Sequence, residues 1–219
     1  MSFIKRYVQG KLKSNCYIFY DESNIAVIDP GEDGPRIEGV INSISKTPKI
    51  HILLTHGHAD QILSVPYLVQ KYPKAFVYAG RSENLFLYDA GVNLSRHMGN
   101  VVTFSDISDN VNLVTGGEEI KVGKYVIRVL ETPGHTPGSV SYIVQDKETV
   151  FTGDTILREG IGGTRLPFGD EASLITSIHD KILTLPQKYK LFPAHGEPTD
   201  VQHELTHNPY VLSMKGNES

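Results

Sequence analysis

The side chains best suited to metal chemistry gather in the segment Thr55-His56-Gly57-His58-Ala59-Asp60-Gln61. Imidazole and carboxylate groups together suit zinc and similar divalent metals. His56 and His58 lie two positions apart in a loop, so both can point at one ion, and Asp60 can turn toward a neighbouring ion. A single His-x-His pair is weak evidence, because most histidines are ordinary surface or core residues. The segment predicts a metal site if further ligands join it.

Three later positions can supply those ligands. They are His135 in Thr132-Pro133-Gly134-His135-Thr136-Pro137-Gly138, Asp154 after Phe151-Thr152-Gly153, and His195 after Leu191-Phe192-Pro193-Ala194. At each one a strand-like segment ends in a turn marked by glycine or proline, which fixes the backbone and can hold a ligand still. Because loops at one edge of a sheet can gather residues distant in sequence, we predict that these positions meet.

The hydrophobic pattern predicts the elements that position these loops. Strands are expected at 4–8, 17–20, 25–28, 50–54, 75–78, 119–122, 125–131, 139–144, 149–152 and 191–192. One helix is expected where Ile37, Val40, Ile41 and Ile44 share a face, and another where Leu174, Ile175, Ile178 and Ile182 share a face. A further helix is expected at 64–71. Short helices are expected in 81–99, and the tail at 197–212 is expected to be partly helical. We predict an α/β (α+β) fold, a four-layer αββα sandwich, as a single domain over residues 1–219.

Composition narrows the range of partners. Hydrophobic residues make up 39% and charged residues 21% of the 219 residues, and the net charge is −4, which disfavours nucleic acid and membrane as partners. No apolar run approaches the roughly 18 residues that a membrane span needs. The N-terminus lacks the apolar core of a secretory signal, and Cys16 is the single cysteine, so we expect a cytoplasmic protein with a small-molecule substrate. The sequence leaves the oligomeric state open.

The residues of these motifs, in this order, resemble the metallo-β-lactamase-fold metallohydrolases. Within that superfamily the chain is similar to the small glyoxalase-II-like (hydroxyacylglutathione hydrolase-like) group, over roughly residues 14–200, with Asp29-Pro30-Gly31 as a further match. The resemblance implies a first metal site of His56, His58 and His135. It also implies that Asp154 bridges two ions and that Asp60 and His195 belong to a second site.

Gln61 departs from that pattern, which places a histidine ligand there. An amide oxygen is a weaker zinc ligand than imidazole. One interpretation is a tightly bound Zn²⁺ at the histidine site with partial occupancy beside it; the other is that both ions are retained. Iron and manganese are alternative metals.

A site with three protein ligands leaves a position for water, whose pKa zinc lowers toward ~7. We therefore expect a metal-dependent hydrolase of a thioester or small ester, with Asp60 as the catalytic residue that orients the water. Alternatives are a mononuclear iron persulfide dioxygenase-like enzyme and a catalytically weakened metal-binding member of the fold.

Glutathione recognition is a separate question. The glutathione-binding Lys and Tyr of glyoxalase II would fall at Gly163 and Arg165, and the chain ends at Ser219, so we expect the C-terminal glutathione-binding domain to be lacking. The substrate-binding residues stay unassigned. His51 precedes the motif in an apolar strand and is expected to be structural.

Overall fold

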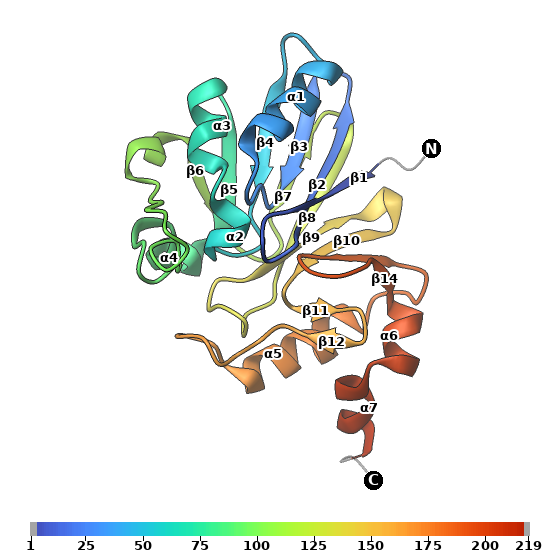
Figure 1. Cartoon of the computed structure of the whole chain (residues 1–219). Helices are drawn as coiled ribbons and strands as arrows, with labels where there is room; N and C mark the ends of the chain where they lie inside the picture. The colour runs from blue at the N-terminus through green and yellow to red at the C-terminus, as the bar shows by residue number, and fades with distance from the viewer. Residues whose placement is uncertain (1–3, 217–219) are drawn as a thin grey trace.

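Two six-stranded sheets form the centre of the molecule (Figure 1). The computed structural model describes residues 4–216, so residues 1–3 and 217–219 of the predicted domain lie outside the described part. The first sheet has the order β1-β2-β3-β4-β5-β6. Its strands are β1 (Ile4–Gln9), β2 (Ser14–Asp21), β3 (Asn24–Ile28), β4 (Lys49–Leu53), β5 (Phe76–Gly80) and β6 (Val111–Val114).

The second sheet has the order β14-β13-β10-β9-β8-β7. Its strands are β7 (Glu119–Val122), β8 (Tyr125–Glu131), β9 (Val140–Val144), β10 (Thr149–Gly153), β13 (Lys190–Pro193) and β14 (Thr199–Asp200). The short strands β11 (Ile156–Leu157) and β12 (Gly160–Ile161) form a separate two-stranded hairpin. The pairs β3–β4, β4–β5, β5–β6 and β10–β13 are parallel. The remaining pairs of the two large sheets are antiparallel.

Side-chain alternation along β2 shows how the layers form. Tyr17 and Phe19 point into the space between the sheets, where they pack with Phe151 of β10. Cys16 and Ile18 point the other way, toward the helices, and are buried there. Because successive strand residues face opposite sides, one strand serves two cores.

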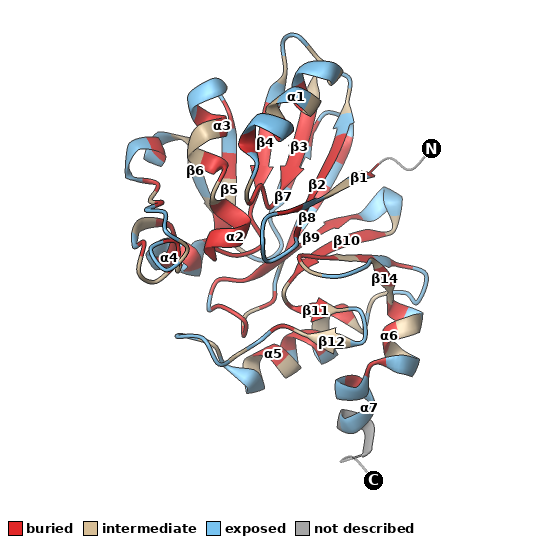
Figure 2. Ribbon diagram, viewed as in Figure 1, coloured by how far each residue is buried: buried red, intermediate tan, exposed pale blue. Residues whose placement is uncertain are grey.

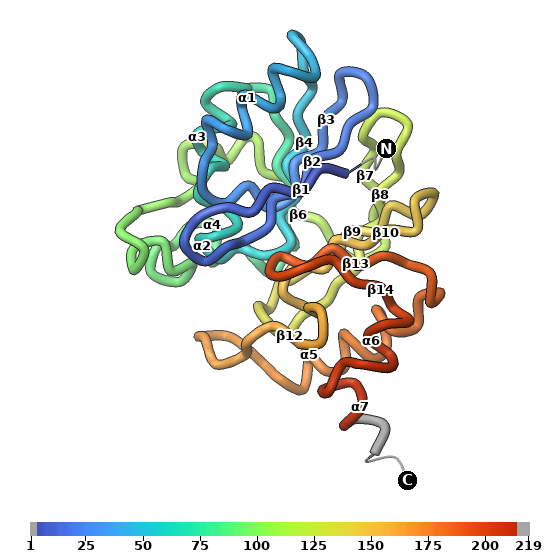
Figure 3. The backbone as a smooth tube through the Cα atoms, turned by 45° about the vertical axis from the view of Figure 1, so that its right-hand side comes forward, coloured from blue at the N-terminus to red at the C-terminus, as the bar shows by residue number. Residues whose placement is uncertain are grey.

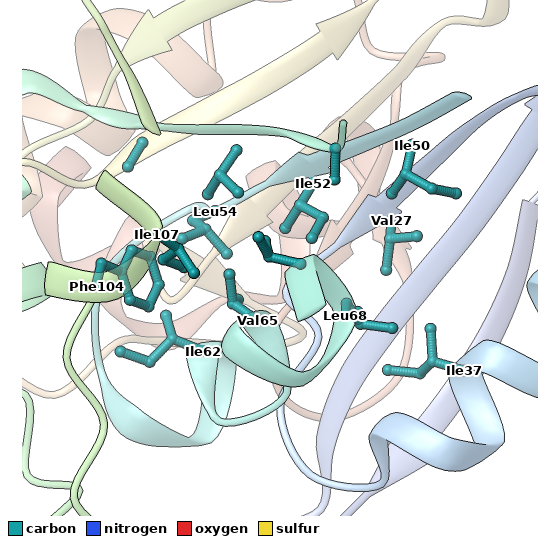
Figure 4. Close-up of a cluster of buried hydrophobic side chains, with 14 of the residues drawn as sticks. Val27, Ile37, Ile50, Ile52, Leu54, Ile62, Val65, Leu68, Phe104 and Ile107 are labelled. Atoms are coloured by element: carbon teal, nitrogen blue, oxygen red, sulfur yellow. The ribbon is translucent and has the colours of Figure 1, made fainter. Parts of the chain in front are cut away.

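Helices cover the outer face of each sheet. Helices α1 (Gly34–Ile44) and α3 (Val65–Lys71) pack on the first sheet through Ile37, Leu68 and the β4 side chains Ile50 and Ile52 (Figure 4). The second sheet is covered by α5 (Glu171–Ser177), its π-helical continuation η4 (Ile178–Ile182), α6 (Val201–His207) and α7 (Pro209–Gly216). The helices show buried inner and exposed outer sides (Figure 2), and α7 lies at the opposite end of the molecule from α1 (Figure 3). The αββα prediction is confirmed.

The structure adds elements that the sequence pattern did not indicate. These are α2 (Ala59–Ile62), β6, the hairpin of β11 and β12, and β14. The segments between 81 and 110 form the short helices η1 (Arg81–Glu83), α4 (Asn84–Tyr88) and η2 (Ser105–Asn110), and residues 145–147 form η3 (Gln145–Lys147). Strand β6 is only four residues long and pairs in parallel with β5, a long-range contact that local periodicity does not reveal.

Candidate metal centre

All six predicted ligand side chains meet at one end of the sheet sandwich. His56 and His58 follow β4, and His135, Asp154 and His195 follow β8, β10 and β13. Asp29, just after β3, fixes the loop after β4, because its carboxylate accepts bonds from the Thr55 backbone N–H and hydroxyl, both at 2.8 Å. Loops of both sheets therefore build the centre together.

His56, His58 and His135, hereafter the histidine group, form the tightest part of the centre. They offer one ligand nitrogen each, with all three nitrogens within 4.8 Å of one another, and all three residues are buried. His58 Nδ1 lies 3.0 Å from His135 Nε2. The buried His56 Nε2 has no hydrogen-bond partner in the described part of the chain. A buried nitrogen without a partner is costly, so this geometry fits a cation that accepts three lone pairs.

Burial keeps the rings of His56 and His58 suited to metal binding. It lowers the pKa of His58 to about 4, with repulsion from His135 as a second cause, and it lowers the pKa of His56 well below its ordinary value. Neutral imidazole is the form that ligates a metal. The outward nitrogen of His135, Nδ1, lies 2.7 Å from the Gly163 carbonyl oxygen, which orients the ring.

Asp154 connects the histidine group to the rest of the centre. Its Oδ2 lies 3.5 Å from His135 Nε2 and 3.9 Å from His56 Nε2, and its Oδ1 lies 2.9 Å from His195 Nδ1. Burial opposes ionisation of this carboxylate, but the hydrogen bond and charge of His195 outweigh it and hold the pKa of Asp154 below its ordinary value. Asp154 thus lies between the histidine group and His195.

Gln61 and His195 both bond to the carboxylate of Asp60, and these three residues are hereafter called the acidic half. Asp60 Oδ2 lies 3.1 Å from His195 Nε2 and accepts a bond of 2.7 Å from the Gln61 side-chain amide. Both ring nitrogens of His195 therefore face carboxylates, and these contacts outweigh burial and raise the pKa of His195 to about 10. Gln61 turns its nitrogen, not its oxygen, toward Asp60, and its buried Oε1 lacks a partner in residues 4–216.

Glu83 is a residue of this region that the sequence did not indicate. It is fully buried, and its carboxylate accepts bonds from Gly57 N–H at 2.8 Å, Gly138 N–H at 2.9 Å and the Thr136 hydroxyl. Burial raises the pKa of Glu83 to about 7, although these three hydrogen bonds act to lower it. In the sequence it lies in the polar stretch Arg81-Ser82-Glu83-Asn84, which looks like an exposed helix start, so no local signal identifies it.

An apolar rim lies beside the histidine group. The ring of Phe86 in α4 packs edge-on against His58, with ring centres 5.4 Å apart, and the ring of Phe168 packs on Phe86 at 5.8 Å. Phe168 and Leu166 leave 52% and 41% of their surface exposed, and Phe168 has a left-handed φ of 70°. A left-handed backbone conformation costs conformational energy for a non-glycine residue, and such residues are frequent at functional sites.

Comparison with known proteins is consistent with this geometry. Residues 10–195 match the model of the metallo-beta-lactamase superfamily. The chain is 36% identical to a probable metallo-hydrolase, YqgX, of Bacillus subtilis over 207 residues, covering 94% of this chain and 96% of the relative. It is 32% identical to the hydroxyacylglutathione hydrolase GloC of Haemophilus influenzae over 205 residues, covering 92% and 94%.

Solved structures agree. The crystal structure of the BLEG-1 B3 metallo-beta-lactamase matches with a TM-score of 0.86 and 33% identity, covering 95% of this chain and 99% of that one. The structure of TTHA1623 in a di-iron-bound form matches with a TM-score of 0.80 and 28% identity, covering 94% and 99%. Within residues 4–216, no helix combines the length and apolar character needed to cross a bilayer.

Proposed function

The chain belongs to the metallo-beta-lactamase superfamily, and on that premise we propose that it is a metal-dependent hydrolase of thioesters or related small esters. The observation that carries the proposal is the histidine group, three buried imidazoles whose ligand nitrogens converge, with a nitrogen of His56 that lacks a hydrogen-bond partner in the described residues. A divalent ion held there would lower the pKa of a water to about 7 and polarise a carbonyl oxygen. A thioester substrate is supported by the similarity to GloC, which is named a hydroxyacylglutathione hydrolase.

Asp60 is the residue proposed to orient the attacking water. The bonds that its carboxylate receives from the described residues both go to Oδ2, from Gln61 and His195, so the carboxylate is held in one orientation. Its Oδ1 is then left to accept a bond from water and to take its proton. A thioester suits this arrangement, because a thiolate leaves with little need for a proton donor.

The metal proposed is zinc, bound tightly by the histidine group and only in part by the acidic half. The weaker binding expected at the acidic half is supported by its hydrogen bonds, because the Gln61 amide already bonds to Asp60 and the His195 ring to Asp154. Iron is the alternative metal, supported by the di-iron-bound form of TTHA1623. Stoichiometric iron with oxygen uptake in place of ester cleavage would favour oxygenase chemistry over hydrolysis.

The rim is proposed to contact the substrate. Phe168 presents exposed apolar surface and packs on Phe86, which in turn contacts His58. A substrate panel should therefore vary the acyl group from small and polar to aromatic on one constant thiol, together with a lactone and a β-lactam. We further propose a cytoplasmic site of action, consistent with the free, buried thiol of Cys16.

The test combines metal analysis with Asp60→Ala. Wild-type protein should hydrolyse a member of the thioester panel, lose activity with a chelator and regain it with zinc. Asp60→Ala should lower kcat by about 100- to 10,000-fold, the range of a lost general base, while the zinc of the histidine group is retained. Full activity in this variant would remove the role given to Asp60, and activity unaffected by complete metal removal would overturn the proposed function.

A further inference from the structure

We propose that Glu83 is a positioning residue of the metal centre, whose carboxylate sets the spacing of the histidine group and thereby its metal affinity. The inference rests on the proposed metal-dependent function. Glu83 with its partners Gly57, Thr136 and Gly138 is called the Glu83 clamp below.

The clamp joins the two loops that supply all three histidines. Gly57 lies between His56 and His58, and its backbone N–H donates to Glu83 Oε2. Thr136 follows His135, and its hydroxyl donates to Oε1, as does the Gly138 N–H from the same loop. Each carboxylate oxygen therefore holds a different loop, so the side chain fixes the distance between them.

Close packing around the clamp explains two glycines of the metal motifs. A Cβ on Gly57 would lie 2.7 Å from Glu83 Oε2 and 2.5 Å from the Cβ of Phe86. A Cβ on Gly138 would lie 2.2 Å from the Glu83 backbone nitrogen. Real Cβ atoms do not approach other atoms so closely, so both loops come against residues 83–86 because these positions lack side chains.

Acceptors on both oxygens make the carboxylate specific. Three donors point at Glu83, one at Oε2 and two at Oε1, and a carboxylate can accept on both oxygens. An amide of the same shape has one acceptor oxygen and an NH₂ group, so at least one loop would face a donor instead of an acceptor. Glu83→Gln therefore separates positioning from simple space filling.

A second buried glutamate provides a matched control. Glu204 in α6 is also fully buried and also accepts three bonds, from the Glu159 N–H at 3.0 Å, Asn208 Nδ2 at 2.8 Å and the Thr199 hydroxyl at 2.5 Å. None of these partners is next to a proposed ligand. Glu204→Gln should destabilise the fold through the same chemistry without touching the centre.

The experiment measures zinc affinity by chelator competition and the visible spectrum of the cobalt-substituted protein for wild type, Glu83→Gln, Glu204→Gln and Thr136→Val. Glu83→Gln should weaken zinc binding about 10- to 100-fold, as loss of a group that orients ligands does, and should change the cobalt spectrum. Thr136→Val removes one donor and should weaken binding less. Glu204→Gln should bind zinc like wild type while its thermal midpoint falls.

Circular dichroism of each metal-free variant checks that it is folded, and Thr136→Val carries the test if Glu83→Gln does not fold. Wild-type zinc affinity and an unchanged cobalt spectrum in folded Glu83→Gln and Thr136→Val would overturn the role of the clamp alone. Equal loss of zinc affinity in Glu204→Gln would also overturn it, because the effect would then follow stability. A wild-type protein that binds no metal would overturn the proposed function and the clamp together.

Discussion

The two halves of the centre both contain residues that can bind a metal, but their polar groups find different partners. In the histidine group, His56 Nε2 is buried without a hydrogen-bond partner in residues 4–216. In the acidic half, Asp60 bonds to Gln61 and His195, and His195 bonds to Asp154. One half is prepared for a cation, whereas the other is stabilised by its own hydrogen bonds. The presence of potential ligands in both halves therefore does not give them equal affinity for a metal ion.

The largest effect that tests this difference comes from removing one histidine on each side. His58→Ala should weaken binding of the tight ion by more than about 100-fold, beyond the loss caused by an orienting partner, because it removes a direct ligand. His195→Ala should leave that ion in place and lower only the occupancy beside it. Zinc per chain after dialysis against a weak chelator measures both. Equal loss of zinc from the two variants would contradict the division into halves.

A smaller effect is expected at Gln61. Gln61→His replaces the amide that bonds to Asp60 with an imidazole that can ligate a metal, so zinc per chain should rise from one toward two. Gln61→Ala is the control, because it removes the same bond to Asp60 without adding a ligand, and its zinc content should stay at the wild-type level. Two tightly bound ions in the wild type would show that the glutamine never limited the second site.

The smallest effect concerns His51, a buried histidine outside the centre. Both of its ring nitrogens lack partners in the described residues, and its ring stacks on Phe76 and Tyr78. Burial lowers the pKa of His51 to about 4, while in the unfolded chain it stays near 6.5. The unfolded state therefore binds the extra proton between these values, and the free energy of unfolding should fall as pH falls from about 6.5 to 4.

His51→Phe should remove this part of the pH dependence. Urea unfolding of the metal-free protein at pH 7, 6 and 5 should show the variant gaining stability relative to wild type as the pH falls, since the titration of all other groups is common to both. His97→Asn, a substitution of an exposed histidine, is the control. Parallel pH profiles for wild type and His51→Phe would contradict the expectation. His51 and His56 both have a buried ring nitrogen without a hydrogen-bond partner in the described residues, but other potential ligands converge only around His56.

Sequence reasoning reached the fold and the meeting of the ligand loops because both depend on local signals. The apolar run 50–54 and the turn Thr132–Gly138 mark a strand end and a rigid loop without knowledge of the rest of the chain. The burial of Glu83 depends on contacts with residues far along the chain, such as Gly138. No periodicity encodes those contacts.

The position of His135 has a consequence for how the chain matures. His58 and His135 approach within 3.0 Å although 77 residues separate them, and they come from opposite sheets. During synthesis the first two histidines leave the ribosome long before the third, so the early chain offers an incomplete set of ligands. An ion bound by all three would join the two sheets in the manner of a cross-link, and its capture would mark the moment at which the N- and C-terminal halves have docked.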